Sequence, residues 1–169
     1  PQDLVYVLGE TRDELGGSEW FAQHNAVGNK VPQVDAKKAM RLYRALSQAI
    51  RAGLVASCHD CSDGGLAVAL AETAFAGGLG LNVDLKDVPY RGKKRDDYIL
   101  FSETASRFVV TVRPQDKTKF DKRMKGNVAR EIGFVTGDGL MQVSGLSGKT
   151  IIQEKIGKLK EAWQKPLNF

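Results

Sequence analysis

Short continuous apolar runs and longer periodic ones alternate along the chain, which predicts both strands and helices. Residues 4–8 are a continuous apolar run that ends at Gly9, as is typical of a buried strand. In residues 36–52 apolar side chains recur every three or four positions, which predicts an amphipathic helix capped by Asp35 and ended by Gly53. Its apolar face is expected to carry Ala39, Leu42, Tyr43, Leu46, Ala49 and Ile50.

Residues 66–76 are a different kind of segment, because only Glu72 and Thr73 interrupt the apolar run. A helix that is apolar on every side is expected to be buried, and the pair at 77–78 (Gly-Gly) should end it. Further strands are expected at residues 54–58, 79–84, 98–101, 108–112, 131–136, 140–143 and 150–152, and further helices near 19–24, 115–124 and 154–163.

Strands and helices are intermixed, and several neighbouring strands have short connections. This arrangement favours a mixed sheet over a purely parallel one. No repeat, low-complexity tract or long linker divides the chain. We therefore predict the α+β class and a single domain over residues 1–169, a length that suits one domain.

The composition is that of an ordinary globular domain, with 42% hydrophobic and 27% charged residues. No apolar run approaches the ~20 residues that cross a bilayer. The run at residues 4–8 also lacks the basic flank of a signal peptide. These features predict a cytoplasmic protein with no membrane partner.

The net charge of +5 raises the question of nucleic-acid binding. Lys and Arg are scattered along the chain except in residues 91–95, where Asp96 and Asp97 follow at once, and we expect that cluster to be a solvated loop. Because nucleic-acid binders of this size show a denser basic stripe, no nucleic-acid partner is predicted. A modest positive balance is compatible with anionic, phosphorylated metabolites.

The two cysteines, Cys58 and Cys61, flank His59 in a C-x-x-C arrangement. A structural zinc site needs four ligands, and no second cysteine pair exists, so no metal site is predicted. A redox pair would open a helix after a strand, and that context is partly met. Reduced thiols are the favoured interpretation, with redox activity as the alternative.

The segment SCHDCSDGG (57–65) joins a predicted strand to the buried helix and puts Gly64 and Gly65 in the first helical turn. Glycine there costs about 0.5–1 kcal/mol against alanine, which either close packing of the turn or a ligand on bare N–H groups would offset. Ser62 is a candidate for capping the helix or for binding a phosphate. Asp60 and Asp63 would compete with an anion, or would instead cap the helix or hold a cation or a ribose hydroxyl. Ligand contact and ordinary turn chemistry stay equally open.

Two other polar segments carry candidate residues. The segment GETRDELGGSE (9–19) repeats the order of strand, polar loop, paired glycines and helix start, with Glu10, Gly17 and Ser18 as candidates. In FSETASRF (101–108), Glu103 and Arg107 either pair across a turn or face a ligand. No P-loop, nucleophile elbow, zinc-protease or dinucleotide motif occurs, so no catalytic residue is predicted.

Taken together, these segments resemble the last domain of the phosphoribosylformylglycinamidine synthase family in its smaller form. The similar stretches occur in the family's order over nearly the whole chain: VYVLGETRDELGGSE, IRAGLVASCHDCSDGGLAVALAETAFAGGLG, LFSETASRFVVTV, IGFVTGDGLMQVSG and KLKEAW. HDCSDGGL and LFSETASRF are the most specific. Cys61 stands where the family is expected to have a small aliphatic residue, which weakens any cysteine chemistry further.

The resemblance implies an aminoimidazole ribonucleotide synthetase C-terminal-domain-like fold, with three α/β/α layers around a mixed sheet. It implies a C-terminal fragment of a larger multidomain enzyme. That enzyme would convert formylglycinamide ribonucleotide to its amidine with ATP, Mg²⁺ and ammonia from a PurQ-like glutaminase, in a complex with a PurS-like subunit. The nucleotide- and metal-binding residues and the catalytic histidine would belong to the preceding domains, so the fragment is expected to be inactive alone and to bind no cofactor tightly.

For the binding residues, the resemblance and the glycine-bearing turns give one hypothesis. Contact with a phosphorylated substrate or a nucleotide phosphate is assigned to Ser62, Gly64, Gly65, Glu10, Gly17, Ser18 and Arg107, with Asp60, Asp63 and Glu103 as polar support. The family carries two copies of its module, so these loops face either the catalytic site or its pseudo-symmetric counterpart. The alternatives are a domain of another superfamily member (aminoimidazole ribonucleotide synthetase, selenophosphate synthetase, thiamine-monophosphate kinase or the hydrogenase-maturation protein) and a scaffold without ligands.

Overall fold

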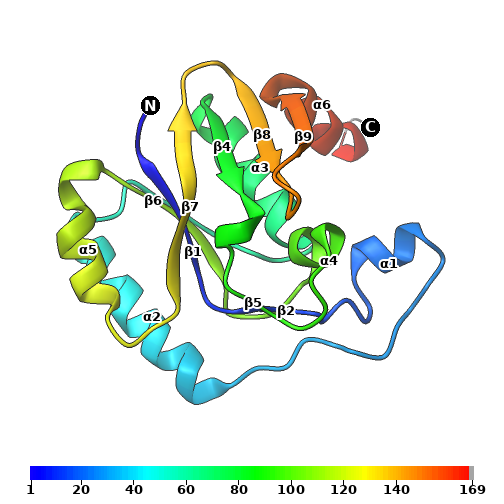
Figure 1. The fold of residues 1–169 in the computed structure, drawn as a ribbon, viewed down its shortest axis with the longest axis horizontal. Helices are drawn as coiled ribbons and strands as arrows, with labels where there is room; N and C mark the ends of the chain where they lie inside the picture. The colour runs from blue at the N-terminus through cyan, green and yellow to red at the C-terminus, as the bar shows by residue number, and fades with distance from the viewer. Residues whose placement is uncertain (168–169) are drawn as a thin grey trace.

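The computed structural model describes residues 1–167, and Figure 1 shows a central sheet with helices on both faces. The main sheet contains β1 (Leu4–Leu8), β3 (Ser57–Asp60), β4 (Gly80–Asp84), β6 (Phe108–Val112), β7 (Ala129–Thr136), β8 (Leu140–Ser144) and β9 (Thr150–Lys155). The helices are α1 (Glu19–Gln23), α2 (Ala36–Arg51), α3 (Gly65–Gly77), α4 (Asp96–Phe101), α5 (Lys117–Met124) and α6 (Ile156–Gln164). Single 3₁₀ turns lie at Leu85–Asp87, Pro114–Asp116 and Lys165–Leu167.

The seven strands lie in the order β3-β6-β1-β7-β4-β8-β9. Every neighbouring pair is antiparallel except β4 and β8, which run parallel. The sheet is therefore mixed, as predicted. Two short strands, β2 (Thr11–Arg12) and β5 (Tyr90–Arg91), pair separately and in parallel.

The side chains of β1 show why helices cover both faces of the sheet. Successive residues of a strand point to opposite faces, and all of Val5, Tyr6, Val7 and Leu8 are buried. Val5 and Val7 join the core under α3, whereas Tyr6 and Leu8 join the core under α2 and α5. Figure 1 accordingly shows α2 and α5 together on one side of the sheet and α3, α4 and α6 on the other. The predicted three-layer α/β/α fold is confirmed.

The two long helices follow their sequence patterns closely. Asp35 caps α2 by accepting a hydrogen bond from the Lys38 amide, and the apolar stripe from Ala39 to Ala49 packs on the sheet. Tyr43 and Ile50 were also expected on that stripe, but they are 39% and 47% exposed because they flank it. The first turns of α3 are buried as predicted, whereas its last two residues, Ala76 and Gly77, are exposed.

Two predicted elements differ from the structure. Residues 98–101 were predicted as a strand but lie in α4, where Asp96 and Asp97 occupy the first turn and favour the helix through its dipole. A short apolar run does not by itself distinguish strand from helix. The strand predicted at 54–58 lies at Ser57–Asp60 instead, because Leu54 packs into the core beneath α2 before pairing with β6 begins. Within residues 1–167, no helix has the length and apolar character needed to cross a bilayer.

Candidate functional site

The turn between β3 and α3 owes its glycines to close packing. Gly64 and Gly65 both have positive φ values, +76° and +65°, which other residues rarely adopt. A Cβ atom on Gly65 would clash with the carbonyl oxygen of Ser102 and lie 2.9 Å from that of Leu100. The start of α3 therefore packs directly against the end of α4. Of the two explanations for the paired glycines, close packing and a ligand, the structure supports close packing.

Glu103 joins the three polar segments that the sequence singled out. Its Oε1 accepts one hydrogen bond from the amide of Gly64 at 2.9 Å and another from the amide of Glu19 at 3.0 Å. The Gly64 amide, expected to be open to a ligand, is thus occupied by a carboxylate of the protein itself. The Gly65 amide donates to the Ser62 carbonyl at 3.0 Å. Both N–H groups are satisfied within the chain.

Arg107 does not pair with Glu103 but is buried, with 1% of its surface exposed. Its guanidinium donates to the carbonyl oxygen of Thr104 at 2.8 Å, to the Thr11 hydroxyl at 3.0 Å and to the Ser102 carbonyl. Burial lowers the pKa of this arginine from its usual value. From its buried position, Arg107 therefore holds residues 102–104 against β2.

Gly17 and Ser18 also form their hydrogen bonds within the chain. The Ser18 hydroxyl caps α1 by accepting from the Phe21 amide, and it donates to the Leu15 carbonyl at 2.7 Å. The amide of Gly17, which has φ +74°, donates to the Val27 carbonyl at 2.7 Å. These contacts help to fix the conformation of residues 9–19, which include Glu10. Gly17 and Ser18 therefore support the candidate site through the conformation of this loop.

The exposed candidates line an open groove of about 630 Å³ beside the β3–α3 turn. Asp60, Ser62, Asp63 and Glu103 contribute to it. The Ser62 hydroxyl donates to the Asp60 carboxylate, and this bond lowers the pKa of Asp60. The lining has three carboxylates and one cation, the buried Arg107, so the groove is acidic and favours hydroxyl or amine donors over phosphate.

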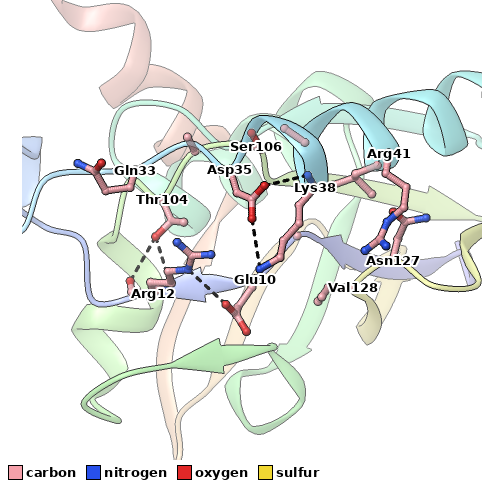
Figure 2. A pocket seen from close by; sticks show the side chains of 14 residues that line it. Glu10, Arg12, Gln33, Asp35, Lys38, Arg41, Thr104, Ser106, Asn127 and Val128 are labelled. Carbon is pink, nitrogen blue, oxygen red and sulfur yellow. Dashed lines mark hydrogen bonds and ion pairs between the residues drawn. The ribbon is translucent and has the colours of Figure 1, made fainter.

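Glu10 lies in a separate hollow of about 160 Å³, shown in Figure 2. Its Oε2 is 3.2 Å from Nε of Arg12, and Lys38 Nζ lies 3.4 Å from the Asp35 carboxylate. Ser106 lines both the hollow and the acidic groove, so residues 103–107 form the ridge between them.

Sequence reasoning missed the basic residues of this hollow, which are Arg12, Lys38 and Arg41. Arg12 is part of the GETRDELGGSE segment, so its place there was the available signal. Lys38 and Arg41 belong to α2, and only the fold brings them to the hollow. Next to Arg12, the buried Oε2 of Glu14 has no hydrogen-bond partner among the described residues.

The two cysteines of the C-x-x-C segment lack the lowered thiol pKa of a reactive pair. Cys61 is buried and Cys58 exposed, and desolvation raises the pKa of both thiols, which keeps them protonated. His59 contacts Glu72 at 2.6 Å instead of either thiol. In residues 1–167, no cluster of three His, Cys, Asp or Glu side chains is arranged to hold a metal ion.

Comparison with known proteins gives relatives along the whole chain. The chain is 38% identical over 166 residues to the "Phosphoribosylformylglycinamidine synthase subunit PurL" of Alkaliphilus metalliredigens, covering 96% of this chain and 21% of that protein. It is 41% identical over 169 residues to the PurL subunit of Thermobifida fusca, covering 98% of this chain and 21% of the relative. The chain thus spans about a fifth of the length of these curated relatives, 21% in both cases.

Solved structures share the fold at lower identity. "T. maritima PurL complexed with FGAR" superposes with a TM-score of 0.80 at 21% identity, over 94% of this chain and 28% of that one. The hydrogenase maturation protein HypE has a TM-score of 0.66 at 14% identity, over 92% of this chain and 53% of that one. Residues 1–145 match the family described as "AIR synthase related protein, C-terminal domain". The chain therefore belongs to this family of C-terminal domains of AIR synthase related proteins.

Proposed function

We propose that this chain is the C-terminal domain of a phosphoribosylformylglycinamidine synthase, a single domain within a longer multidomain enzyme. The observation that carries the proposal is the identity of 38–41% to PurL subunits over 96–98% of the chain. HypE, a protein of another kind with this fold, is 14% identical.

The reaction proposed for the complete enzyme is the conversion of formylglycinamide ribonucleotide to its amidine. ATP would phosphorylate the formamide oxygen, and ammonia would then displace the phosphate, with Mg²⁺ as the metal ion. Support comes from T. maritima PurL, whose structures are described as complexes with ATP, with ADP and with FGAR. A glutaminase of the PurQ type would supply ammonia, and PurS would complete the complex, as the name of the T. maritima PurLQS structure suggests. The proposed location is the cytoplasm.

Within that enzyme, the domain would hold polar groups of a ligand and perform no bond-breaking step itself. The acidic groove suits hydroxyl groups such as those of a ribose, which Asp60, Asp63 and Ser62 can bind as hydrogen-bond partners. The hollow with Arg12, Lys38 and Arg41 suits a phosphate better than the acidic groove does, since it brings three cations beside two carboxylates, Glu10 and Asp35. Gly17, Ser18, Gly64, Gly65 and Arg107 would position these surfaces.

A domain-exchange experiment tests the proposal. The matching fifth of the A. metalliredigens PurL subunit is replaced by this chain, and amidine formation from formylglycinamide ribonucleotide, ATP and ammonia is measured. We expect the chimera to be active and residues 1–169 alone to be inactive. The matched control carries the part of HypE that superposes on this chain, which has the same fold, and should be inactive.

Folding of both chimeras is checked by gel filtration and by thermal unfolding. A chimera with this chain that folds as well as the parent but forms no amidine would overturn the proposal. Activity of the HypE control would show that the fold alone suffices, and the sequence similarity would then carry no functional information.

A further inference from the structure

Folding gathers positive charge on one face of the molecule, although Lys and Arg are scattered in the sequence. Residues 36–51 and 117–125, which contain α2 and α5, hold ten of the 25 Lys and Arg residues and one of the 20 Asp and Glu residues. The rest of the chain holds 15 basic and 19 acidic residues and is net negative. The two helices lie side by side on the same face of the sheet (Figure 1). The segments of α2 and α5 therefore carry a net positive charge, and the rest of the chain carries a small net negative charge.

The basic residues of α2 form a stripe along the helix. Lys37, Arg41, Arg44 and Arg51 follow the intervals of three and four residues that place side chains on one face of a helix, with Gln48 filling the remaining position. The stripe is about 21 Å long at 1.5 Å per residue. All five side chains are exposed.

A groove of about 690 Å³ runs between this stripe and the end of α5. It is lined by five cationic side chains: Lys37, Arg41, Arg44, Arg123 and Lys125. None of these five forms an ion pair within residues 1–167. Two have neutral partners, since Arg41 donates to Asn127 at 3.3 Å and Arg123 to Gln48 at 3.2 Å. Their charges remain available to a partner.

The groove also contains apolar surface. Ala36, Met40 and Ala45 line it between the cations, and Met40 is 48% exposed. Methionine adapts its shape to apolar partners and is common on protein-binding surfaces. The phosphate backbone of a nucleic acid would gain nothing from contact with these apolar side chains. The groove also lacks the aromatic side chains on which bases stack, because its lining includes no Phe, Tyr, Trp or His.

We propose that the groove between α2 and α5 is a docking surface for an acidic, amphipathic helix of a partner protein. Charge complementarity selects an acidic partner, and arginine binds carboxylates with two parallel hydrogen bonds. The length of the stripe matches about four turns of a helix, far more than a single small anion needs. The apolar residues of the groove receive the apolar stripe of the same helix.

The probe is a fluorescein-labelled helical peptide of about 18 residues, roughly 27 Å long, with Glu on one face and Leu beside it. Binding to the full 169-residue chain is measured by fluorescence anisotropy at low and at physiological ionic strength. We expect saturable binding that weakens as salt increases. A peptide with Gln at every Glu position tests the need for negative charge, and we expect it to bind at least about tenfold more weakly.

Two double variants with the same change in net charge locate the site. Arg41→Glu with Arg44→Glu reverses the centre of the stripe and is expected to weaken binding by at least about tenfold. Lys93→Glu with Lys94→Glu reverses two exposed residues of the loop before α4 and should change binding by less than about twofold. Circular dichroism and the thermal midpoint confirm that both variants fold.

Four results would overturn the proposal. Equal weakening in both double variants would show non-specific attraction, and equal binding of the Gln peptide would show that charge is not recognised. Tighter binding of duplex or single-stranded nucleic acid at physiological salt would assign the face to a nucleic acid. Absence of peptide binding by the PurL chimera described above, when the isolated chain does bind, would show that the preceding polypeptide covers the groove.

Discussion

The carboxylate of Glu103 accepts a hydrogen bond from the amide of Gly64 at 2.9 Å, across 39 positions of sequence. The same oxygen accepts from Glu19, so one side chain ties the start of α3 to the start of α1. A negative charge at these helix starts is also favourable for their dipoles. Glu103 is therefore the side chain that links all three candidate segments.

Replacing Glu103 by alanine leaves the partly buried Gly64 amide without its acceptor. We expect Glu103→Ala to lower the free energy of unfolding by about 1–3 kcal/mol, and Glu103→Gln, which keeps an acceptor oxygen, to lower it by less. Urea unfolding measures both. Glu161→Ala, at an exposed position on α6, is the control and should stay within about 0.5 kcal/mol of the original chain. Equal stability of Glu103→Ala and the control would contradict the role given to this link.

A series of three glycine variants separates backbone strain from steric clash. Gly77→Ala has neither problem, since its φ is not positive and nothing lies near the added Cβ atom. Gly53→Ala adds only strain, because its φ is +68° but its surroundings are open. Gly65→Ala adds both, because the new atom meets the carbonyl oxygens of Ser102 and Leu100.

The expected order of stability is Gly77→Ala, then Gly53→Ala, then Gly65→Ala. We expect no loss for Gly77→Ala, about 1 kcal/mol for Gly53→Ala and more than about 3 kcal/mol for Gly65→Ala. Thermal and urea unfolding measure the three values. If Gly65→Ala cost no more than Gly53→Ala, the turn would not be packed against α4 as the structure shows.

The sequence predicted the two long helices because their segments are long, whereas the three layers were implied by the resemblance to the family. Residues 36–51 show the helical period over several turns, and residues 65–77 form an apolar run too long for an ordinary strand. Residues 98–101 are too short for such a distinction, and the helix there depends on Asp96, whose carboxylate also accepts from the amide of Leu146 at 2.8 Å. A contact 50 residues away is not visible in a local pattern.

The site was predictable as a set of segments but not as a set of contacts. The sequence identified the loops of Glu10, Gly64 and Glu103, which the fold does bring together. It did not show that the Glu103 carboxylate would occupy the amide of Gly64, since that depends on the path of the chain after α4. It indicated the basic side of α2 but did not show that α5 extends it, because the two helices lie more than 60 residues apart in sequence and meet only on the sheet.

Burial of Cys61 predicts a loss of stability at alkaline pH. The pKa of its thiol is raised by desolvation in the folded protein, so the folded state keeps its proton where the unfolded chain begins to lose it. The contribution of Cys61 is therefore complete below the thiol pKa of the unfolded chain, about 8.5, and is lost as the pH rises above it. The free energy of unfolding should therefore fall as the pH rises above about 8.5.

Cys61→Ala removes this titration and should make the fall with pH shallower, whatever its effect on stability at neutral pH. Cys58→Ser is the matched control at the exposed position, and the change in slope should be smaller there. Urea unfolding at several pH values gives the slopes. Identical slopes for Cys61→Ala and the original chain would show that the Cys61 thiol ionises as readily in the folded state as in the unfolded one.

Trp163 holds the C-terminal helix α6 on α3, beyond the residues that match the family. Its indole Nε1 donates to Glu72 at 2.8 Å, and its ring lies 5.6 Å from that of Phe75. Trp163→Phe keeps the ring but loses the hydrogen bond, whereas Trp163→Ala loses both.

Hydrogen exchange of the amides in residues 156–164 measures how firmly α6 is held. We expect exchange to accelerate by up to about tenfold in Trp163→Phe, from loss of one hydrogen bond of about 0.5–1.5 kcal/mol, and further in Trp163→Ala. The amides of α1, on a different part of the molecule, serve as the internal control and should be unchanged. Because Trp163 is half exposed, the effect should stay local to α6 and leave global unfolding almost unaltered. Unchanged exchange of α6 in Trp163→Ala would mean that the partly buried Ile156 and Leu159, which pack against the core, hold the helix by themselves.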